Sequence, residues 1–310
     1  MVRVAITGAG GFLGSAAVSH FSLHPDIQEI RALYSRLPDV SKVSRKVTSF
    51  IGDLRDHAVV DSLVDGVDVV LHLASRGYPL DTVDDPVQLI VDNLCATGAL
   101  LAAMVKKGTK RIVYASSGGA LYANDRESSP ITEEAATAGR SAYAITKLAI
   151  EDILRLPAYS PWLKPCILRI SNPYGAGLMR RERQGFVGIA LKKLLAGETL
   201  DIWGSDQIRK DFIYIDDVMT AFEKVMLFPD AGCDVYHVST GVPTSLREVI
   251  AAMEEICGRK LSTRVLAPRA ADSPWTALSS EKFSLAYDWR PHYDIKAGMT
   301  AMIARMHEQD

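Results

Sequence analysis

The chain has 310 residues, of which 48% are hydrophobic and 23% charged, and its formal net charge at pH 7 is −2. This length is enough for one large core and a smaller second lobe. The balanced charge, without a Lys/Arg-rich run interleaved with aromatic residues, argues against nucleic acid as a partner.

The start of the chain and its apolar segments bear on localisation. Met1 leads directly into the strand-like run Val2–Ile6, which leaves no room for a charged leader and an apolar signal core. We expect no later apolar stretch to be long enough to cross a bilayer. The predicted location is therefore the cytoplasm, with no membrane partner.

The residues that commonly bind metals are scattered. The four cysteines are Cys95, Cys166, Cys233 and Cys257. Each stands alone in an apolar context, which favours reduced core thiols over a disulfide framework or a zinc site. His20 and His24 lie four apart on a predicted helix without an evident third ligand, and Asp216-Asp217 precede an apolar run, where carboxylates suit a helix start. We expect no metal site.

Strand-like runs rich in Val, Ile and Leu alternate with helical patterns through the first half of the chain. The predicted strands are Val2–Ile6, Ile27–Tyr34, Val47–Ile51, Val67–Leu73, Arg111–Ala115 and Pro165–Ile170. The predicted helices are Gly11–Leu23, His57–Val64, Pro86–Lys107 and Ala142–Leu154. This alternation predicts an α/β fold of the Rossmann type, a doubly wound parallel sheet with helices on both faces.

From Asn172 onward the alternation decays, which predicts a second, smaller α/β lobe that binds substrate. Later helices are expected at Gly185–Ala196, Ser245–Cys257 and Lys296–His307. Two more strand-like runs, Asp211–Ile215 and Val235–Val238, predict a return to the first sheet. We therefore assign residues 1–175, with returning segments near 211–240, to the nucleotide-binding domain, and residues 176–310 to an interleaved substrate lobe. The stretch Arg126–Arg140 is predicted to be a plain surface loop.

A glycine-rich turn, Thr7-Gly8-Ala9-Gly10-Gly11-Phe12-Leu13-Gly14, follows the first strand. Gly8, Gly11 and Gly14 let the backbone turn sharply and bring its N–H groups, together with those of Phe12 and Leu13 at the helix start, against a pyrophosphate. The alternative is a tight strand-to-helix turn that binds nothing.

The end of the second predicted strand bears on the choice of dinucleotide. Tyr34-Ser35-Arg36 stands where a carboxylate commonly holds a free ribose 2′-hydroxyl, and Arg36 could pair with a 2′-phosphate. The expected cofactor is thus NADP, with NAD as the alternative, and Arg36 as a solvated loop residue is the competing interpretation. In Gly52-Asp53-Leu54, Asp53 is placed near the adenine with Leu54 beside it, or else Asp53 or Asp56 caps a helix.

Tyr143 and Lys147 lie four apart on a predicted helix and therefore share a face. A cation beside a phenol favours the phenolate, so Lys147 is expected to make Tyr143 a workable acid and base for hydride transfer, beside the cofactor. An exposed Tyr/Lys pair without function is more common, and the glycine turn upstream is what favours catalysis.

These motifs resemble the extended short-chain dehydrogenase/reductase family, specifically its NAD(P)-dependent sugar-nucleotide epimerases and dehydratases, and the resemblance runs nearly end to end. The other segments similar to family motifs are Leu71–Ser75, Asn93, Tyr114–Tyr122 and Leu168–Gly175. The first of these implies that Leu73, Ala74 and Ser75 pass under the cofactor.

The segment that resembles the family's third catalytic position departs from the usual pattern. Counting back from Tyr122, Gly118 occupies the place of the usual Ser or Thr, so we assign the hydroxyl to Ser117, with Ser116 as the weaker alternative. Gly119-Ala120 replaces the Asp-Glu pair of the dehydratases, which argues against dehydration.

The resemblance implies that the second lobe holds a nucleoside diphosphate sugar. Asn172 is similar to the family Asn at the diphosphate, Arg209 or Lys210 to its basic partner, and Arg269 to a second phosphate-binding Arg. Pairing of family members through helices equivalent to Pro86–Lys107 and Ala142–Leu154 implies a homodimer.

The predicted function is an NAD(P)-dependent nucleotide-sugar epimerase that acts through a transient keto-sugar. The alternative is an NADP-dependent reductase of a 4-keto nucleotide sugar, and a more distant one is a non-catalytic dinucleotide sensor.

Overall fold

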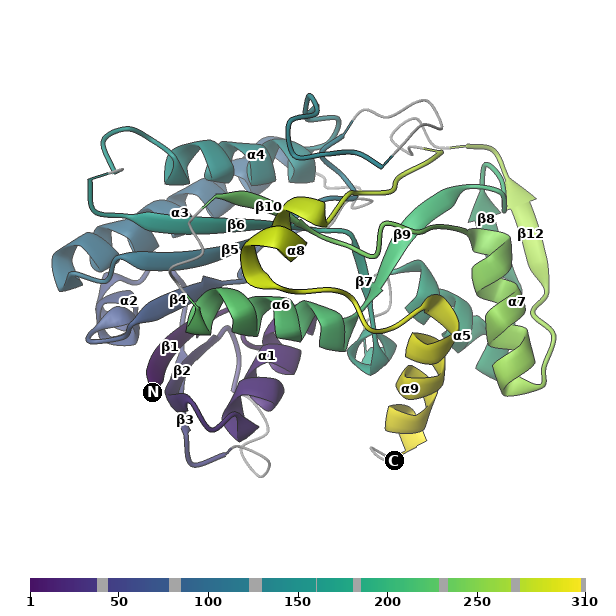
Figure 1. Ribbon diagram of the computed structural model, residues 1–310, viewed down its shortest axis with the longest axis horizontal. Coiled ribbons are helices and arrows are strands. Elements are labelled where there is room, and N and C mark those ends of the chain that lie inside the picture. The colour runs from purple at the N-terminus through teal and green to yellow at the C-terminus, as the bar shows by residue number, and fades with distance from the viewer. Residues whose placement is uncertain are drawn as a thin grey trace.

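The computed structural model describes residues 1–37, 44–77, 85–122, 130–159, 161–180, 185–228, 234–268 and 274–307. Its largest element is a sheet of seven parallel strands in the order β10-β6-β5-β4-β1-β2-β3 (Figure 1). In chain order these strands are β1 (Val2–Thr7), β2 (Ile27–Tyr34), β3 (Val47–Ile51), β4 (Val69–His72), β5 (Arg111–Ser117), β6 (Lys164–Ile170) and β10 (Val235–Val238). The order reverses between β1 and β4, which confirms the predicted Rossmann-type fold.

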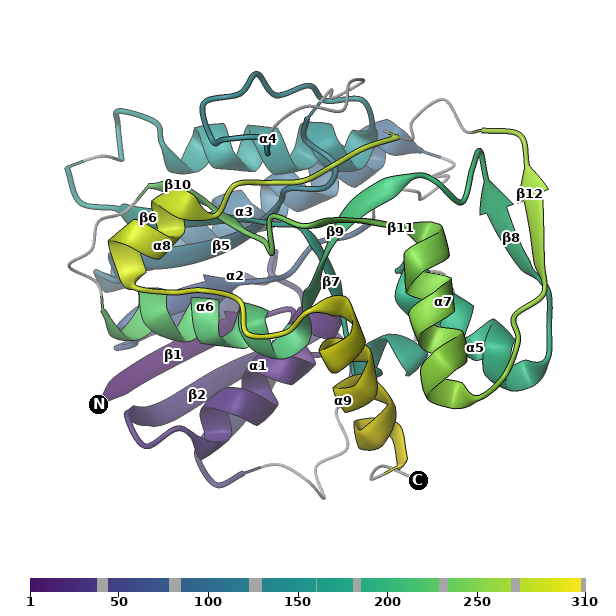
Figure 2. The same ribbon diagram turned by 45° about the vertical axis from the view of Figure 1, so that its right-hand side comes forward.

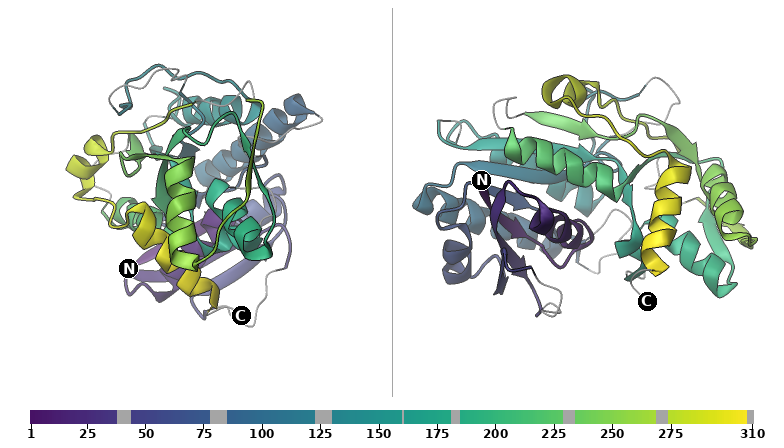
Figure 3. Two further views of the ribbon diagram at one scale, coloured as in Figure 1. Left: turned by 90° about the vertical axis from the view of Figure 1, so that its right-hand side faces the viewer. Right: turned by 60° about the horizontal axis from the view of Figure 1, so that its bottom comes forward.

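Helices cover both faces of the sheet, as Figures 1 and 3 show. One face packs on α1 (Phe12–Leu23), α6 (Ile215–Leu227) and α8 (Glu281–Tyr287), and the other on α2 (His57–Val64), α3 (Pro86–Lys107) and α4 (Ala142–Leu154). Successive strand residues feed these two cores in turn: Val4 and Ile6 join the first and Ala5 the second. Burial on both faces explains why the strands read as nearly continuous apolar runs.

Helix α3 corrects one expectation from the sequence. With 22 residues it is long and apolar enough to cross a membrane by length and composition, so the expectation that no such stretch exists is wrong. In the fold, α3 packs between α2 and α4, and its buried face carries the polar residues Asn93 and Thr97 beside Leu100 and Leu101. Packing against the sheet thus accounts for much of its apolar character.

Beyond Ile170 the chain builds a smaller lobe (Figure 2). Its elements are β7 (Asn172–Tyr174), the 3₁₀ turn η2 (Ala176–Arg180), α5 (Phe186–Ala196), β8 (Leu200–Trp203), β9 (Arg209–Tyr214), β11 (Pro243–Ser245), α7 (Leu246–Cys257), β12 (Thr263–Leu266) and α9 (Ile295–His307). They include a three-stranded sheet, β11-β9-β7, and a two-stranded sheet, β12-β8.

Only one of the two strands predicted to return to the first sheet does so. Strand β10 pairs with β6, and all four of its residues are buried. Strand β9 pairs instead with β7 and β11. Its first residues, Arg209 and Lys210, are only half-buried, which suits a small sheet better than the covered edge of the large one.

Several smaller expectations also change. Of the predicted surface loop, residues 130–140 are described, and within them Ile131 pairs with Leu278 and is buried. Cys95 is exposed, so it is no core thiol, whereas Cys166 is buried and Cys233 lies outside the described residues. The predicted helix start at Asp216-Asp217 is confirmed, because both lie in the first turn of α6.

Two histidines are buried in the sheet. His72 of β4 lies between two hydroxyls, with Nδ1 2.8 Å from Thr7 Oγ1 and Nε2 3.1 Å from Thr97 Oγ1. His237 of β10 places Nε2 2.6 Å from the Tyr122 hydroxyl. Burial lowers the pKa of His72 to about 3 and that of His237 to about 4, so both rings are neutral near pH 7.

Mild acid is therefore expected to destabilise the fold. Unfolded histidines take up a proton near pH 6.5, whereas His72 and His237 resist protonation until about pH 3 and 4. The stability they contribute is present above pH 6.5 and falls by about 1.4 kcal/mol per pH unit for each as the pH drops. Urea unfolding between pH 7.5 and 5 should show this slope. In His72→Gln the slope of the unfolding free energy against pH should be smaller by the share of one histidine, about 1.4 kcal/mol per pH unit. His57→Gln, at the exposed start of α2, is the control and should keep the wild-type slope. An unchanged slope in His72→Gln would contradict this account.

Candidate functional site

The turn between β1 and α1 leaves no room for side chains at two positions and little at a third. Gly8 has a φ of +69°, and a Cβ added there would lie 2.7 Å from the backbone of Ala74. A Cβ at Gly14 would lie 2.1 Å from the Gly8 carbonyl oxygen, and one at Gly11 would lie 3.0 Å from the same atom. Gly8 and Gly14 therefore permit backbone-to-backbone contacts that any other residue would block, and a Cβ at Gly11 would fit more tightly than most Cβ atoms do.

The start of α1 is suited to an anion. The helix begins at Phe12, and within the described part of the chain no side chain caps it and no acidic residue lies in its first turn. The Phe12 side chain is buried in the core and Leu13 is half-buried, so the backbone N–H groups are what this end offers to a ligand. Unpaired N–H groups and the helix dipole favour a pyrophosphate here, and the turn thus fits a dinucleotide.

The loop after β4 lies directly beside this turn. The Thr7 hydroxyl oxygen accepts hydrogen bonds from the backbone N–H groups of Leu73 (3.1 Å) and Ala74 (3.2 Å), and Ser75 is exposed. The Gly8 backbone touches the same loop. The three residues predicted to pass under the cofactor are therefore brought together with the glycine turn.

The residues predicted to surround the adenine differ in their exposure and in their partners. Arg36 is exposed just beyond β2, and Leu54 is buried. Asp53 binds Arg55 through two contacts of 2.9 Å, and these hydrogen bonds lower the pKa of Asp53 to about 2. The helix cap is Asp56, whose carboxylate accepts from the first N–H groups of α2. The Asp53 carboxylate is thus paired with Arg55, a residue of the same loop.

Tyr143 and Lys147 project from one face of α4, whose start is capped by Ser141. The Lys147 side chain is buried, and its Nζ donates to the carbonyl oxygen of Ala115 (2.8 Å) and lies 5.6 Å from the centre of the Tyr143 ring. Burial lowers the pKa of Lys147 to about 8, an effect that the Glu151 carboxylate opposes. The helix therefore presents a phenol and an ammonium group together.

The expected lowering of the Tyr143 pKa by Lys147 is not what the structure gives. Burial raises the pKa of Tyr143 to about 12, and it outweighs the hydrogen bond with Ser117, which lowers the pKa. The Lys147 ammonium faces the Ala115 carbonyl oxygen, which takes up part of its charge. In the protein without ligands Tyr143 is thus a neutral phenol near pH 7.

The end of β5 separates the three candidates for the hydroxyl group. Ser117 hydrogen bonds with Tyr143. Ser116 points elsewhere, because its hydroxyl donates to Glu151 (2.5 Å). At Gly118 an added Cβ would lie 2.1 Å from Cδ1 of Leu278, a fully buried residue of the C-terminal segment. The space for a side chain at Gly118 is therefore filled by Leu278, and Ser117 is the serine that faces the phenol.

In the second lobe, Asn172 lies on β7, close to the end of β5. Its Nδ2 donates to the Asp211 carbonyl oxygen (2.8 Å), and a Cβ at Gly119 would lie 3.0 Å from its Oδ1. The absence of a side chain at Gly119 lets the Asn172 amide sit next to the end of β5.

Two of the predicted phosphate-binding residues, Arg209 and Lys210, are consecutive on β9, so their side chains leave opposite faces of the strand. Arg209 donates to the Pro243 carbonyl oxygen (2.8 Å) and to Glu248 (3.2 Å). Arg269 lies outside the described residues.

A buried ion pair beneath the Tyr/Lys pair was missed in the sequence. Arg169 of β6 binds Glu151 of α4, with Nη2 2.6 Å from Oε2 and Nε 3.1 Å from Oε1, and the side chains are 5% and 0% exposed. The sequence holds a signal for it: Glu151 continues the four-residue spacing of Tyr143 and Lys147, and Arg169 interrupts an apolar strand.

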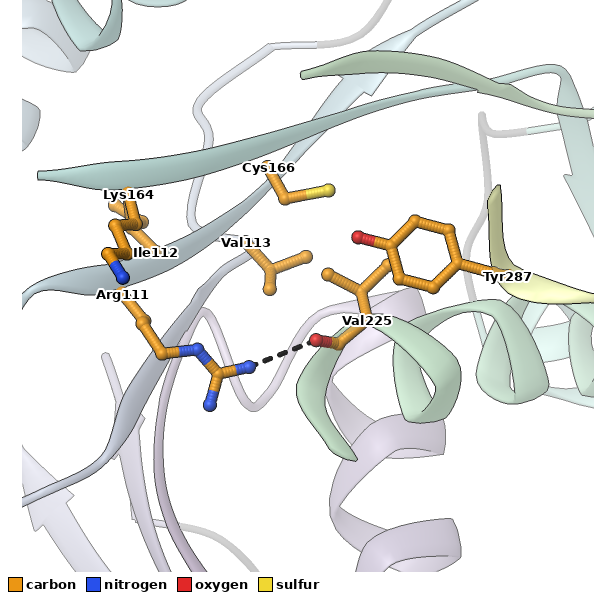
Figure 4. A pocket seen from close by; sticks show the side chains of 7 residues that line it. All are labelled: Arg111, Ile112, Val113, Lys164, Cys166, Val225 and Tyr287. Carbon is orange, nitrogen blue, oxygen red and sulfur yellow. Dashed lines mark hydrogen bonds between the residues drawn. The ribbon is translucent and has the colours of Figure 1, made fainter. Parts of the chain in front are cut away.

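The cavity in Figure 4 lies at the other end of the strands from the candidate site, where β5 and β6 begin. It is lined by Arg111, Ile112, Val113, Lys164, Cys166, Val225 and Tyr287. Ligands of doubly wound sheets bind at the carboxyl ends of the strands, so this cavity is separate from the candidate site.

A doubly wound sheet with a glycine turn at its switch point and a Tyr/Lys pair on the neighbouring helix defines a dinucleotide-dependent enzyme of the extended short-chain dehydrogenase/reductase class. The chain belongs to the NAD dependent epimerase/dehydratase family, whose model matches residues 4–239. It is an epimerase or a reductase of that family.

Individual relatives cover almost the whole chain. The dTDP-4-dehydro-6-deoxyglucose reductase of Escherichia coli is 26% identical, over 97% of this chain and 96% of its own. The UDP-glucose 4-epimerase of Bacillus subtilis (strain 168) is 29% identical, over 98% and 95%. The solved structure of Thermus thermophilus UDP-glucose 4-epimerase in complex with NAD is 28% identical, with a TM-score of 0.87 over 98% and 99% of the two chains. The relatives thus include both an epimerase and a reductase, and they give no support to the expected preference for NADP.

Replacing Gly14 by Ala is expected to abolish dinucleotide binding, because the new Cβ would collide with the Gly8 carbonyl oxygen. The control is Gly98→Ala in the middle of α3, where nothing lies within 4 Å of the added Cβ. This control should bind normally and gain about 0.5–1 kcal/mol in stability. The amount of NAD that each purified variant releases on denaturation, together with urea unfolding, checks both variants. A normal NAD content in Gly14→Ala would contradict the proposed cradle.

Proposed function

We propose that the protein is a nucleotide-sugar epimerase that acts through a transient keto-sugar, with its substrate between the nucleotide-binding domain, which contains the seven-stranded sheet, and the smaller lobe that begins at β7. The observation that carries this proposal is the hydrogen bond of Tyr143 with Ser117 beside the Lys147 ammonium, next to a glycine turn that fits a dinucleotide.

A nicotinamide bound beside Tyr143 would supply a hydride acceptor and donor. We assign Tyr143 as the group that takes the proton of a sugar hydroxyl when that carbon is oxidised, and returns it when the ketone is reduced. Ser117 donates a hydrogen bond to the same oxygen. Because burial raises the pKa of Tyr143 to about 12, formation of its phenolate depends on the nearby Lys147 charge once substrate excludes water.

For the diphosphate we propose Asn172, with Arg209 or Lys210 as its basic partner and Arg269 as a further cation. Asn172 already touches the backbone next to the catalytic strand. Arg209 already donates to Glu248 and to a carbonyl oxygen, and the Lys210 side chain leaves the other face of β9.

For the cofactor we propose NAD, since a solved relative binds it. Arg36 supports NADP only through its position after β2, where it is exposed. The cradle is formed by Gly8, Gly11 and Gly14, with the loop at residues 73–75 below it. We further propose a cytoplasmic homodimer that pairs through α3 and α4, on which Val87, Val91 and Ile145 are exposed.

The second candidate, a reductase of a 4-keto nucleotide sugar, is favoured by the similarity to the Escherichia coli reductase. The two activities differ in what happens to the cofactor. An epimerase regenerates its dinucleotide in every turnover, whereas a reductase consumes one reduced dinucleotide for each product molecule.

Tyr143→Phe is expected to lower kcat on UDP-, GDP-, dTDP- or CDP-sugars about 10²–10⁴-fold, because the variant has no acid or base at the reacting oxygen. Tyr159→Phe, in the connection after α4 where Tyr159 packs on Trp162, is the matched control and should keep its activity. Full turnover by Tyr143→Phe would overturn the assignment. A wild-type protein that turns over none of these sugars would favour the dinucleotide sensor.

The purified protein is expected to carry bound oxidised NAD, which is released on denaturation and identified by chromatography. Turnover of the nucleotide sugar should proceed without added reductant. Stoichiometric consumption of NADPH during turnover would exclude the epimerase and establish the reductase.

A further inference from the structure

Glu151 lies one helical turn beyond Lys147, at the spacing that separates Lys147 from Tyr143. Residues four apart share a helix face, so the three side chains line one side of α4. The Glu151 carboxylate is fully buried and accepts hydrogen bonds from Ser116 of β5 and from Arg169 of β6. It therefore joins the helix of Tyr143 to both neighbouring strands.

The partners of Glu151 are themselves held in place. Arg169 donates through Nη1 to the Tyr122 hydroxyl (2.6 Å), which lies 2.6 Å from His237 Nε2. His237 Nδ1 lies 3.1 Å from the Ser279 carbonyl oxygen, so the ring must donate from Nδ1, and its Nε2 then accepts from Tyr122. The direction of every hydrogen bond in this chain is thus fixed, and the Arg169 fork cannot turn away from Glu151 without leaving buried groups unpaired.

Lys147 is packed among few groups that can carry charge. Tyr143 and Glu151 face it from its own helix, Tyr114 of β5 places its ring centre 4.9 Å from Nζ, and His72 of β4 is the fourth. His72 is neutral near pH 7, and the two phenols are neutral as well. Glu151 is therefore the negative charge among these four groups.

We propose that Glu151 is a positioning residue: its buried carboxylate, locked one helical turn beyond Lys147, keeps the Lys147 ammonium charged beside Tyr143. Arg169 serves this role by locking the carboxylate in place. The inference rests on the proposed function, in which Tyr143 and Lys147 work on the substrate and cofactor.

The test is Glu151→Gln, which keeps the size and an acceptor oxygen but removes the charge. Burial alone then acts on Lys147, so its pKa should fall from about 8 by about one unit. NMR titration of the protein labelled with [¹³Cε]-lysine measures this pKa directly, with Lys147→Arg identifying the resonance. At pH 7.5 the charged fraction of Lys147, and with it kcat, should fall about threefold, with KM changed less than about twofold.

Asp152→Asn is the matched control, since Asp152 is the next residue on α4 and its carboxylate is 75% exposed and paired with Arg155. It should move neither the Lys147 pKa nor the pH profile. A folded Glu151→Gln protein with the wild-type Lys147 pKa overturns the proposal.

If Glu151→Gln does not fold, because a buried Arg169 charge is left unpaired, the double variant Glu151→Gln/Arg169→Met removes both charges. A fall of the Lys147 pKa in the same direction is expected in it, smaller because the positive charge of Arg169 is removed as well, and an unchanged value overturns the proposal. The NMR measurement needs no turnover, so it judges Glu151 even if Tyr143→Phe remains active and the proposed function fails.

Discussion

The close approach of two backbone segments, the turn after β1 and the loop after β4, is the constraint on which the candidate site depends. Gly8 and Gly14 allow this approach because they have no Cβ, and Thr7 secures it with hydrogen bonds to the N–H groups of Leu73 and Ala74. The contact aims the start of α1 across the carboxyl ends of the strands, toward the edge that also carries Ser117. Moving either segment would change the position of the glycine turn relative to Tyr143.

The C-terminal segment around Leu278 and Ser279 packs against the ends of the central strands. Leu278 fills the space beside Gly118, and Ser279 ends the hydrogen-bond chain that begins at Glu151. Residues more than a hundred positions beyond α4 thus shape its surroundings.

Much of the fold could be predicted from the sequence, because strands buried on both faces leave continuous apolar runs and amphipathic helices leave periodic ones. Helices α2, α3 and α4 and strands β2, β3 and β10 have the predicted bounds. The residues of a strand do not show which sheet the strand joins. For that reason β9 was expected in the large sheet, whereas it pairs with β7 and β11. Residue spacing placed Tyr143 and Lys147 on one face of α4, but it did not give the balance of burial and charge, which raises the Tyr143 pKa. The pairing of Glu151 with Arg169 joins two elements through tertiary packing alone.

The return of β10 to the large sheet has a consequence for biosynthesis. β10 covers the edge of β6, but it is made more than sixty residues later, after β7, α5, β8, β9 and α6. Until then a growing chain would expose the unpaired backbone of β6, a feature that invites association between chains. The two lobes are therefore expected to mature as one cooperative unit, and a fragment cut near residue 175 should be prone to aggregate.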